Sequence, residues 1–160
     1  TLLLPKFKDK KLKLSIFANF GDNRKIYAND KMLNLFLLDI LDIIKSKEIN
    51  AYLKLSKKVK YSKKTREISK YSSKRIIFTD EIKSKSSNLL EPLSSKAIIR
   101  ETDIVICSPF TTPAFEAKLL KKAVFFYDPI GVLENDKETL RNIPIIKSKE
   151  QLSKKIDKYL

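Results

Sequence analysis

Short apolar runs alternate with longer helical patterns along the chain, and this alternation constrains the fold more than any other feature. Runs typical of strands lie at residues 12–20, 50–55, 75–79, 104–107, 123–128 and 145–146. Helical spacing or helix-starting residues occupy the stretches 30–44, 62–72, 92–101, 114–122 and 149–160. Strands separated by helices form βαβ units. The chain is therefore predicted to adopt a Rossmann-like α/β fold, a mostly parallel sheet with helices on both faces, as a single domain over residues 1–160.

In a parallel sheet of this kind, ligands bind outside the carboxyl ends of the strands, where the strand order reverses. The loops at those ends are residues 19–24, 54–57, 79–81, 107–112 and 127–131. We expect the functional site to be built from these loops.

Several residue types that catalytic and cofactor-binding sites commonly use are rare or absent in this chain. The chain has no histidine, and its one cysteine, Cys107, falls inside a predicted strand, where we expect a core residue. Its two glycines, Gly21 and Gly131, cannot form a glycine-rich phosphate loop, which argues against a dinucleotide-binding dehydrogenase and a P-loop NTPase. The carboxylates form no Asp-x-Asp pair, so we expect neither a metal nor another cofactor.

The formal net charge is +15, which taken alone suggests a nucleic acid or an anionic membrane surface as a partner. Lysine is spread along the whole chain, however, instead of gathering on one helix or tail. We interpret the charge as background composition combined with attraction to a phosphorylated substrate or the anionic inner leaflet, and expect no nucleic-acid partner. No apolar run approaches the ~20 residues of a membrane span. The expected location is cytoplasmic, with peripheral contact to the inner face of the cell membrane.

One loop stands out from the others. Between the predicted strand at 104–107 and the next helix, Ser108, Thr111 and Thr112 supply three hydroxyls. Pro113 suits the first turn of that helix, which makes Thr112 the expected N-cap. Free amides and the positive end of the helix then favour a phosphate group beside the hydroxyls. The alternative is an ordinary N-cap followed by a proline.

The stretch from Asp103 to Pro129 resembles the donor-side signature of bacterial GT-B glycosyltransferases. It is most similar to the polysaccharide-biosynthesis proteins named for a Pro-Phe-Thr-Ser motif, read here as Pro109, Phe110, Thr111 and Thr112. The resemblance implies the C-terminal, nucleotide-sugar (donor) binding half of a GT-B fold. It implies transfer of a sugar from a nucleotide-activated donor, CMP-linked sugars among them, to a glycan or lipid-linked acceptor in capsule or lipopolysaccharide biosynthesis. The catalytic base is then expected on a missing N-terminal domain, so that this glycosyltransferase chain alone should be inactive.

The resemblance also implies roles for individual residues, which form the expected donor-binding set. Ser108, Thr111 and Thr112 would hold the donor phosphate, and Lys54 would neutralise its charge. Glu116 would accept a ribose or sugar hydroxyl; the alternative is a carboxylate facing solvent.

Three further residues complete this set. Phe110 belongs to the motif itself. Thr79 would line the nucleobase pocket through backbone groups. Asp128 would either contact the donor or cap the turn at Pro129.

Two other functions stay open. One is a CDP-glycerol glycerophosphotransferase of the teichoic-acid type, whose corresponding segment is a Thr-Asp-Tyr-Ser-Ser stretch; Pro109 and Phe110 stand here in place of Asp-Tyr. The other is a basic, non-catalytic nucleic-acid-binding α/β module, which accounts for the charge but leaves the hydroxyl-rich helix start unexplained.

Overall fold

A six-stranded sheet forms the centre of the structure, and its neighbouring strands are parallel. The computed structural model describes residues 4–18, 30–55, 74–79, 94–131, 133 and 142–160. The strands are β1 (Lys13–Ala18), β2 (Asn50–Leu55), β3 (Ile76–Phe78), β4 (Ile104–Cys107), β5 (Ala123–Tyr127) and β6 (Ile145–Ile146). Their order is β3-β2-β1-β4-β5-β6, which is the strand order of Rossmann folds. The predicted Rossmann-like parallel sheet is confirmed.

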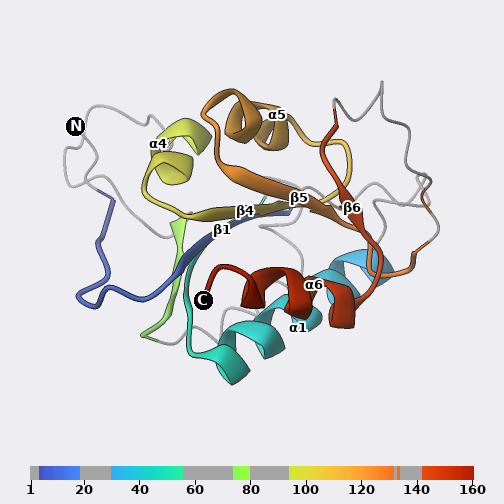
Figure 1. Ribbon diagram of the computed structural model, residues 1–160, viewed down its shortest axis with the longest axis horizontal. Helices are drawn as coiled ribbons and strands as arrows, with labels where there is room; N and C mark the ends of the chain where they lie inside the picture. Colours follow the sequence, from blue (N-terminus) through green and yellow to red (C-terminus); the bar gives the residue numbers. More distant parts are fainter. Residues whose placement is uncertain (1–3, 19–29, 56–73, 80–93, 132, 134–141) are drawn as a thin grey trace.

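Helices cover the sheet on both sides. They are α1 (Asp30–Lys47), α4 (Ser95–Arg100), α5 (Thr112–Leu119) and α6 (Lys149–Asp157). Helices α1 and α6 pack on one face, and α4 and α5 pack on the other (Figure 1). The predicted arrangement, with helices on both faces, is therefore also confirmed.

Strand β4 shows how the sheet joins the two layers. All four of its side chains are fully buried. Ile104 and Ile106 pack into the core formed with α1 and α6, whereas Val105 and Cys107 pack into the core formed with α4 and α5. A strand that is apolar on both faces is typical of a covered parallel sheet, and this explains the unbroken sequence Ile-Val-Ile-Cys.

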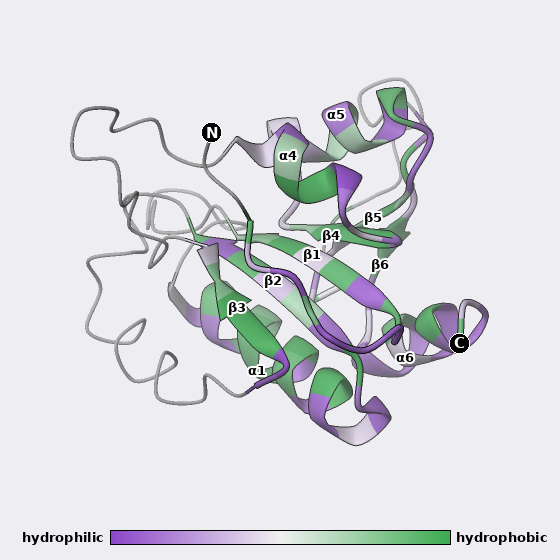
Figure 2. Ribbon diagram, turned by 90° about the vertical axis from the view of Figure 1, so that its left-hand side faces the viewer, coloured by the Kyte–Doolittle hydropathy of each residue, from purple (hydrophilic) through white to green (hydrophobic). Residues whose placement is uncertain are grey.

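Helix α1 carries two carboxylates within its long apolar stretch, and each has a partner on another element. Asp39 accepts a hydrogen bond from Tyr127 at the end of β5, and Asp42 pairs with Lys149 at the start of α6. Lys47 pairs with Asp157 at the other end of α6. Hydrophobic and hydrophilic residues alternate along α1, as expected of a helix with one face on the sheet (Figure 2).

Several predicted boundaries are corrected by the structure. The helix expected at 92–101 begins at Ser95, because the Ser94 hydroxyl caps it by accepting a bond from the Ala97 amide. The helix expected at 114–122 begins two residues earlier and ends at Leu119. The predicted helix at 62–72 and the loop at 19–24 lie outside the described residues. No helix in the described part of the chain is long and apolar enough to cross a bilayer.

Candidate functional site

The strand order reverses between β1 and β4, and a cavity of about 210 Å³ lies at the carboxyl ends of the strands on this side. Strands β1 and β2 and the starts of α4 and α5 form its walls. The lining residues are Phe17, Ala18, Lys54, Leu55, Ser95, Thr111, Thr112 and Pro113. The cavity therefore lies where ligands bind in sheets of this topology.

The sheet register places Lys54 close to this switch point. Phe17 is the Cα partner of Lys54 on one side and of Cys107 on the other. Since neighbouring strands are about 4.8 Å apart, Lys54 lies roughly 10 Å from the end of β4, on the same face of the sheet. Lys54 lines the same cavity as Thr111 and Thr112, so it can act together with the loop that follows β4.

The loop after β4 is held in place by buried hydrogen bonds. The Ser108 amide donates to the Phe17 carbonyl oxygen across 2.9 Å, which extends the β1–β4 ladder. The Thr111 hydroxyl donates to the Ser108 carbonyl oxygen, also across 2.9 Å. Ser108 and Thr111 are buried, whereas Thr112 is exposed. Of the three predicted residues, Thr112 is therefore the exposed one, and it lines the cavity.

The cap of α5 differs from the prediction. Thr111, not Thr112, is the N-cap, with φ −97° and ψ 145°; its hydroxyl makes no capping bond and donates to the Ser108 carbonyl oxygen. Pro113 has no N–H, and the Ala114 amide donates to the Thr111 carbonyl oxygen across 3.2 Å. The helix start thus offers a ligand fewer free amides than we expected. The Thr112 amide is the main one that is left.

Glu116 lies one turn along α5 from Thr112, so the two share a helix face. One carboxylate oxygen, Oε2, is buried and makes no hydrogen bond within the described residues. Burial strongly raises the pKa of the neighbouring Cys107 thiol; the Thr111 hydroxyl lowers that pKa and the Glu116 charge raises it. Glu116 is therefore not the wholly solvent-facing carboxylate of the alternative interpretation, and Cys107 is an unreactive core residue, as predicted.

Of the predicted residues, Lys54, Thr111 and Thr112 line the cavity, whereas Ser108, Glu116, Thr79, Asp128 and Phe110 are not among its lining residues. Thr79 is buried and its hydroxyl donates to the Leu53 carbonyl oxygen across 3.3 Å. Asp128 is fully buried and accepts bonds from the amides of Ile130, Gly131 and Leu133, at 3.1, 3.0 and 2.8 Å. Of the two roles that the sequence left open for Asp128, a donor contact or a cap of the turn at Pro129, the structure shows the cap.

Phe110 points toward another part of the molecule. Its ring centroid lies 6.1 Å from that of Phe126 on β5, and the residue is 38% exposed. Its φ of 62° is in the left-handed region, which is unusual for a bulky residue. This conformation turns the chain sharply between Pro109 and Thr111 and so directs the start of α5 toward the cavity.

Ser95 lines the cavity but was missed by the sequence interpretation. The boundary of α4 was expected near Pro92, which placed Ser95 inside a helix and away from any loop. The signal was the pair Ser94–Ser95 before the apolar pair Ile98–Ile99, a pattern typical of a helix N-terminus.

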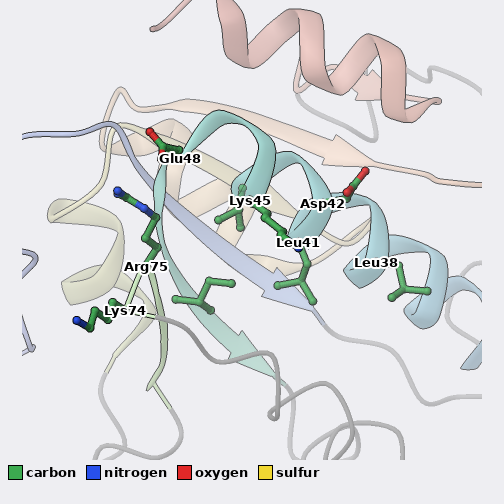
Figure 3. A pocket seen from close by; sticks show the side chains of 9 residues that line it. Leu38, Leu41, Asp42, Lys45, Glu48, Lys74 and Arg75 are labelled. Carbon is green, nitrogen blue, oxygen red and sulfur yellow. The ribbon is translucent and has the colours of Figure 1, made fainter.

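A larger cavity of about 680 Å³ lies elsewhere, between α1 and β3. Helix α1 contributes Leu38, Leu41 and Lys45, and Lys74 and Arg75 come from the turn before β3 (Figure 3). None of its lining residues borders the smaller cavity at the switch point. We therefore assign the smaller cavity as the candidate site. No group of three or more metal-binding side chains gathers anywhere in the described part of the chain.

Comparisons with known proteins identify a family for the chain. A family model described as "Polysaccharide biosynthesis PFTS motif protein" matches residues 14–156. No curated protein matches the chain. The crystal structure of a CE4 family pseudoenzyme from Bacillus anthracis aligns with 93% of the chain, with 15% identity and a TM-score of 0.34, and the chain spans 60% of that protein's length. A likeness at this level says nothing about activity.

Proposed function

The chain belongs to the polysaccharide biosynthesis PFTS motif protein family, and from that premise we propose that its switch-point cavity binds the phosphate of a nucleotide-activated sugar. In this proposal the protein is the donor-binding part of a GT-B-type glycosyltransferase of surface polysaccharide biosynthesis. The acceptor is a glycan or a lipid-linked glycan.

The meeting of Lys54 and Thr112 at the start of α5 carries this proposal. Lys54, the exposed Thr112 and the positive end of α5 border one cavity, and none of the described residues that line it is acidic. Each of these groups favours an anion with oxygen acceptors. A phosphate meets that description better than a neutral sugar or a cation does.

Glu116 does not line the cavity, but it lies one turn along α5 from Thr112 and would favour a different part of the ligand. A carboxylate oxygen that is buried without a partner gains most from a hydroxyl donor. It would repel a phosphate, so the ligand should present a phosphate to Lys54 and Thr112 and a ribose or sugar hydroxyl to Glu116. A nucleotide-linked sugar has both groups.

The transfer itself requires a base that we assign to another part of the protein. The acceptor hydroxyl forms a C–O bond at the anomeric carbon while the bond from that carbon to the donor phosphate oxygen breaks. The nucleotide leaves with its phosphate, and the base takes the proton of the hydroxyl. Lys54 and the start of α5 would stabilise the charge that develops on the departing phosphate.

Calorimetric titration with CMP, CDP, UDP and GDP, with and without EDTA, tests the proposal. We expect weak binding of a cytidine or uridine nucleotide that EDTA does not change. A strict need for magnesium would contradict the metal-free site, and no binding by any nucleotide would contradict the function. Tighter binding of CDP-glycerol than of nucleotide sugars would favour the glycerophosphotransferase alternative.

A further inference from the structure

Helices α4 and α5 lie side by side (Figure 1). Their N-terminal ends line the cavity, so their C-terminal ends lie away from it. The Lys122 ammonium ties them together by donating to the carbonyl oxygens of Thr102 and Arg100, at 2.8 and 3.4 Å. Three cationic side chains are exposed near these C-terminal ends. With Leu119 they form what we call the α4–α5 patch: Arg100, Lys118, Leu119 and Lys121.

Leu119 gives the patch an apolar component. It is 80% exposed, more than any other large hydrophobic side chain in the described part of the chain. A single exposed leucine is ordinary by itself. Here it lies between Lys118 and Lys121, and basic residues around an apolar side chain are the combination that binds anionic lipid surfaces.

A rigid turn presents these residues. The Lys122 amide donates to the Ala117 carbonyl oxygen and the Lys121 amide to that of Lys118, each across 3.0 Å. Together these two bonds form a Schellman motif, in which glycine is the usual residue at the left-handed position. Lys121 occupies that position with φ 57°, so the chain keeps a cation where a glycine would cost less.

We propose that the α4–α5 patch docks the protein on an anionic phospholipid bilayer. Charge complementarity supplies the attraction, and Leu119 enters the boundary between headgroups and acyl chains. An apolar side chain at this place favours a bilayer over nucleic acid, whose phosphates and grooves would leave it exposed to water. The proposal is independent of the nucleotide site, which lies at the other end of α5, about 12 Å away along the helix axis.

Partitioning of the full chain onto vesicles tests this docking surface. We expect binding to vesicles that contain phosphatidylglycerol, and little to pure phosphatidylcholine. Lys121→Gly should lower the partition coefficient about fivefold, as the loss of one basic contact predicts. The melting temperature of this variant should not fall, because glycine relieves the strained conformation. If Lys121 acted only through stability, the partition coefficient would not fall while the melting temperature stayed the same.

Matched variants separate the patch from the net charge. Lys118→Glu with Lys121→Glu should reduce partitioning more than tenfold. Lys45→Glu with Lys158→Glu, which makes the same change of charge on α1 and after α6, should reduce it much less. Leu119→Ser should weaken binding, whereas Leu38→Ser, at the exposed leucine of α1, should not.

Two results would overturn the proposal. Equal losses in the patch and control pairs would mean that net charge alone attracts the protein to lipid. If the patch variants weakened binding to duplex DNA at physiological salt but not to vesicles, the surface would be a nucleic-acid site.

Discussion

The hydroxyl of Tyr127, the last residue of β5, donates a hydrogen bond to Asp39 Oδ2 on α1 across 2.5 Å. The tyrosine ring is fully buried and packs 5.7 Å from the ring of Phe36. Tyr127→Phe keeps the ring contact and removes the bond. Because hydrogen bonds to charged groups contribute about 1.5–3 kcal/mol, we expect the free energy of unfolding in urea to fall by about that amount. Asp39→Asn keeps a hydrogen-bond acceptor for Tyr127, so it should lower the free energy of unfolding less than Tyr127→Phe does.

Alkaline pH should weaken the fold. Burial raises the pKa of Tyr52 to about 12, and burial with the Asp39 hydrogen bond raises the pKa of Tyr127 as well. Above the ordinary tyrosine pKa of about 10, the unfolded chain releases these protons while the folded chain keeps them. Stability is therefore complete below pH ~10 and declines as the pH rises above it. Urea midpoints measured from pH 8 to 11.5 should show this decline, and it should be smaller in Tyr52→Phe.

The hydroxyls of the loop after β4 should have separable effects. Thr112→Val removes the exposed hydroxyl and should weaken nucleotide binding about tenfold, with little change in stability. Thr111→Val removes the buried bond to Ser108 and should lower stability by about 1 kcal/mol. Calorimetry and urea unfolding of both variants measure the two effects.

Ser148→Ala is the matched control for this pair. Its hydroxyl caps α6 by accepting from the Gln151 amide, so the variant loses about 1 kcal/mol of stability far from the cavity. Nucleotide affinity should not change. Full affinity in folded Thr112→Val would contradict the phosphate site.

Replacing Glu116 with glutamine should raise stability and lower affinity together. The neutral amide removes an unpaired buried charge, which we expect to stabilise the free protein by about 1 kcal/mol. A neutral acceptor binds a ligand hydroxyl less strongly, so nucleotide-sugar affinity should fall about fivefold. Glu150→Gln makes the same charge change on α6 and should leave affinity as it is. If affinity is unchanged in Glu116→Gln too, Glu116 lies outside the site.

The left-handed conformation of Phe110 predicts an inverted order of substitutions. At φ 62°, alanine is strained and glycine is not, so Phe110→Gly should be more stable than Phe110→Ala by about 1 kcal/mol. Phe115 also packs on Phe126 but lies within α5, where Phe115→Gly should be less stable than Phe115→Ala by a similar amount. The same order at both positions would show that the turn at Phe110 is not left-handed.

The sequence predicts the class of fold because strand and helix patterns are local. The run Ile104–Cys107 identifies a doubly covered strand without any knowledge of its neighbours. Strand order is not local: nothing near Lys13–Ala18 shows that β4, and not β3, lies beside it. The shift of the α5 cap has a different cause, because the Thr111 hydroxyl bonds locally to the Ser108 carbonyl oxygen, three residues earlier, and residue types alone do not reveal that bond.

The candidate site was predicted in part for the same reason. Lys54 and Thr112 follow from their places at strand and helix ends. Asp128 and Thr79 occupy equivalent places, yet their oxygens bond to backbone groups, and the sequence does not reveal such bonds. Phe110 illustrates a further limit, because a sign change in one dihedral angle sends its ring to β5 instead of the cavity.

The position of the cavity also bears on the order in which the protein folds. Leu14 pairs with Ile104, ninety positions later, so closing the sheet between β1 and β4 costs more chain entropy than pairing strands that are near in sequence. Phe17, Ala18, Lys54 and Leu55 come from the first half of the sheet, and Ser95, Thr111, Thr112 and Pro113 come from the second. Neither half holds the cavity alone. A ligand that fills it therefore binds the joined state, and its binding energy resists the separation of the two halves.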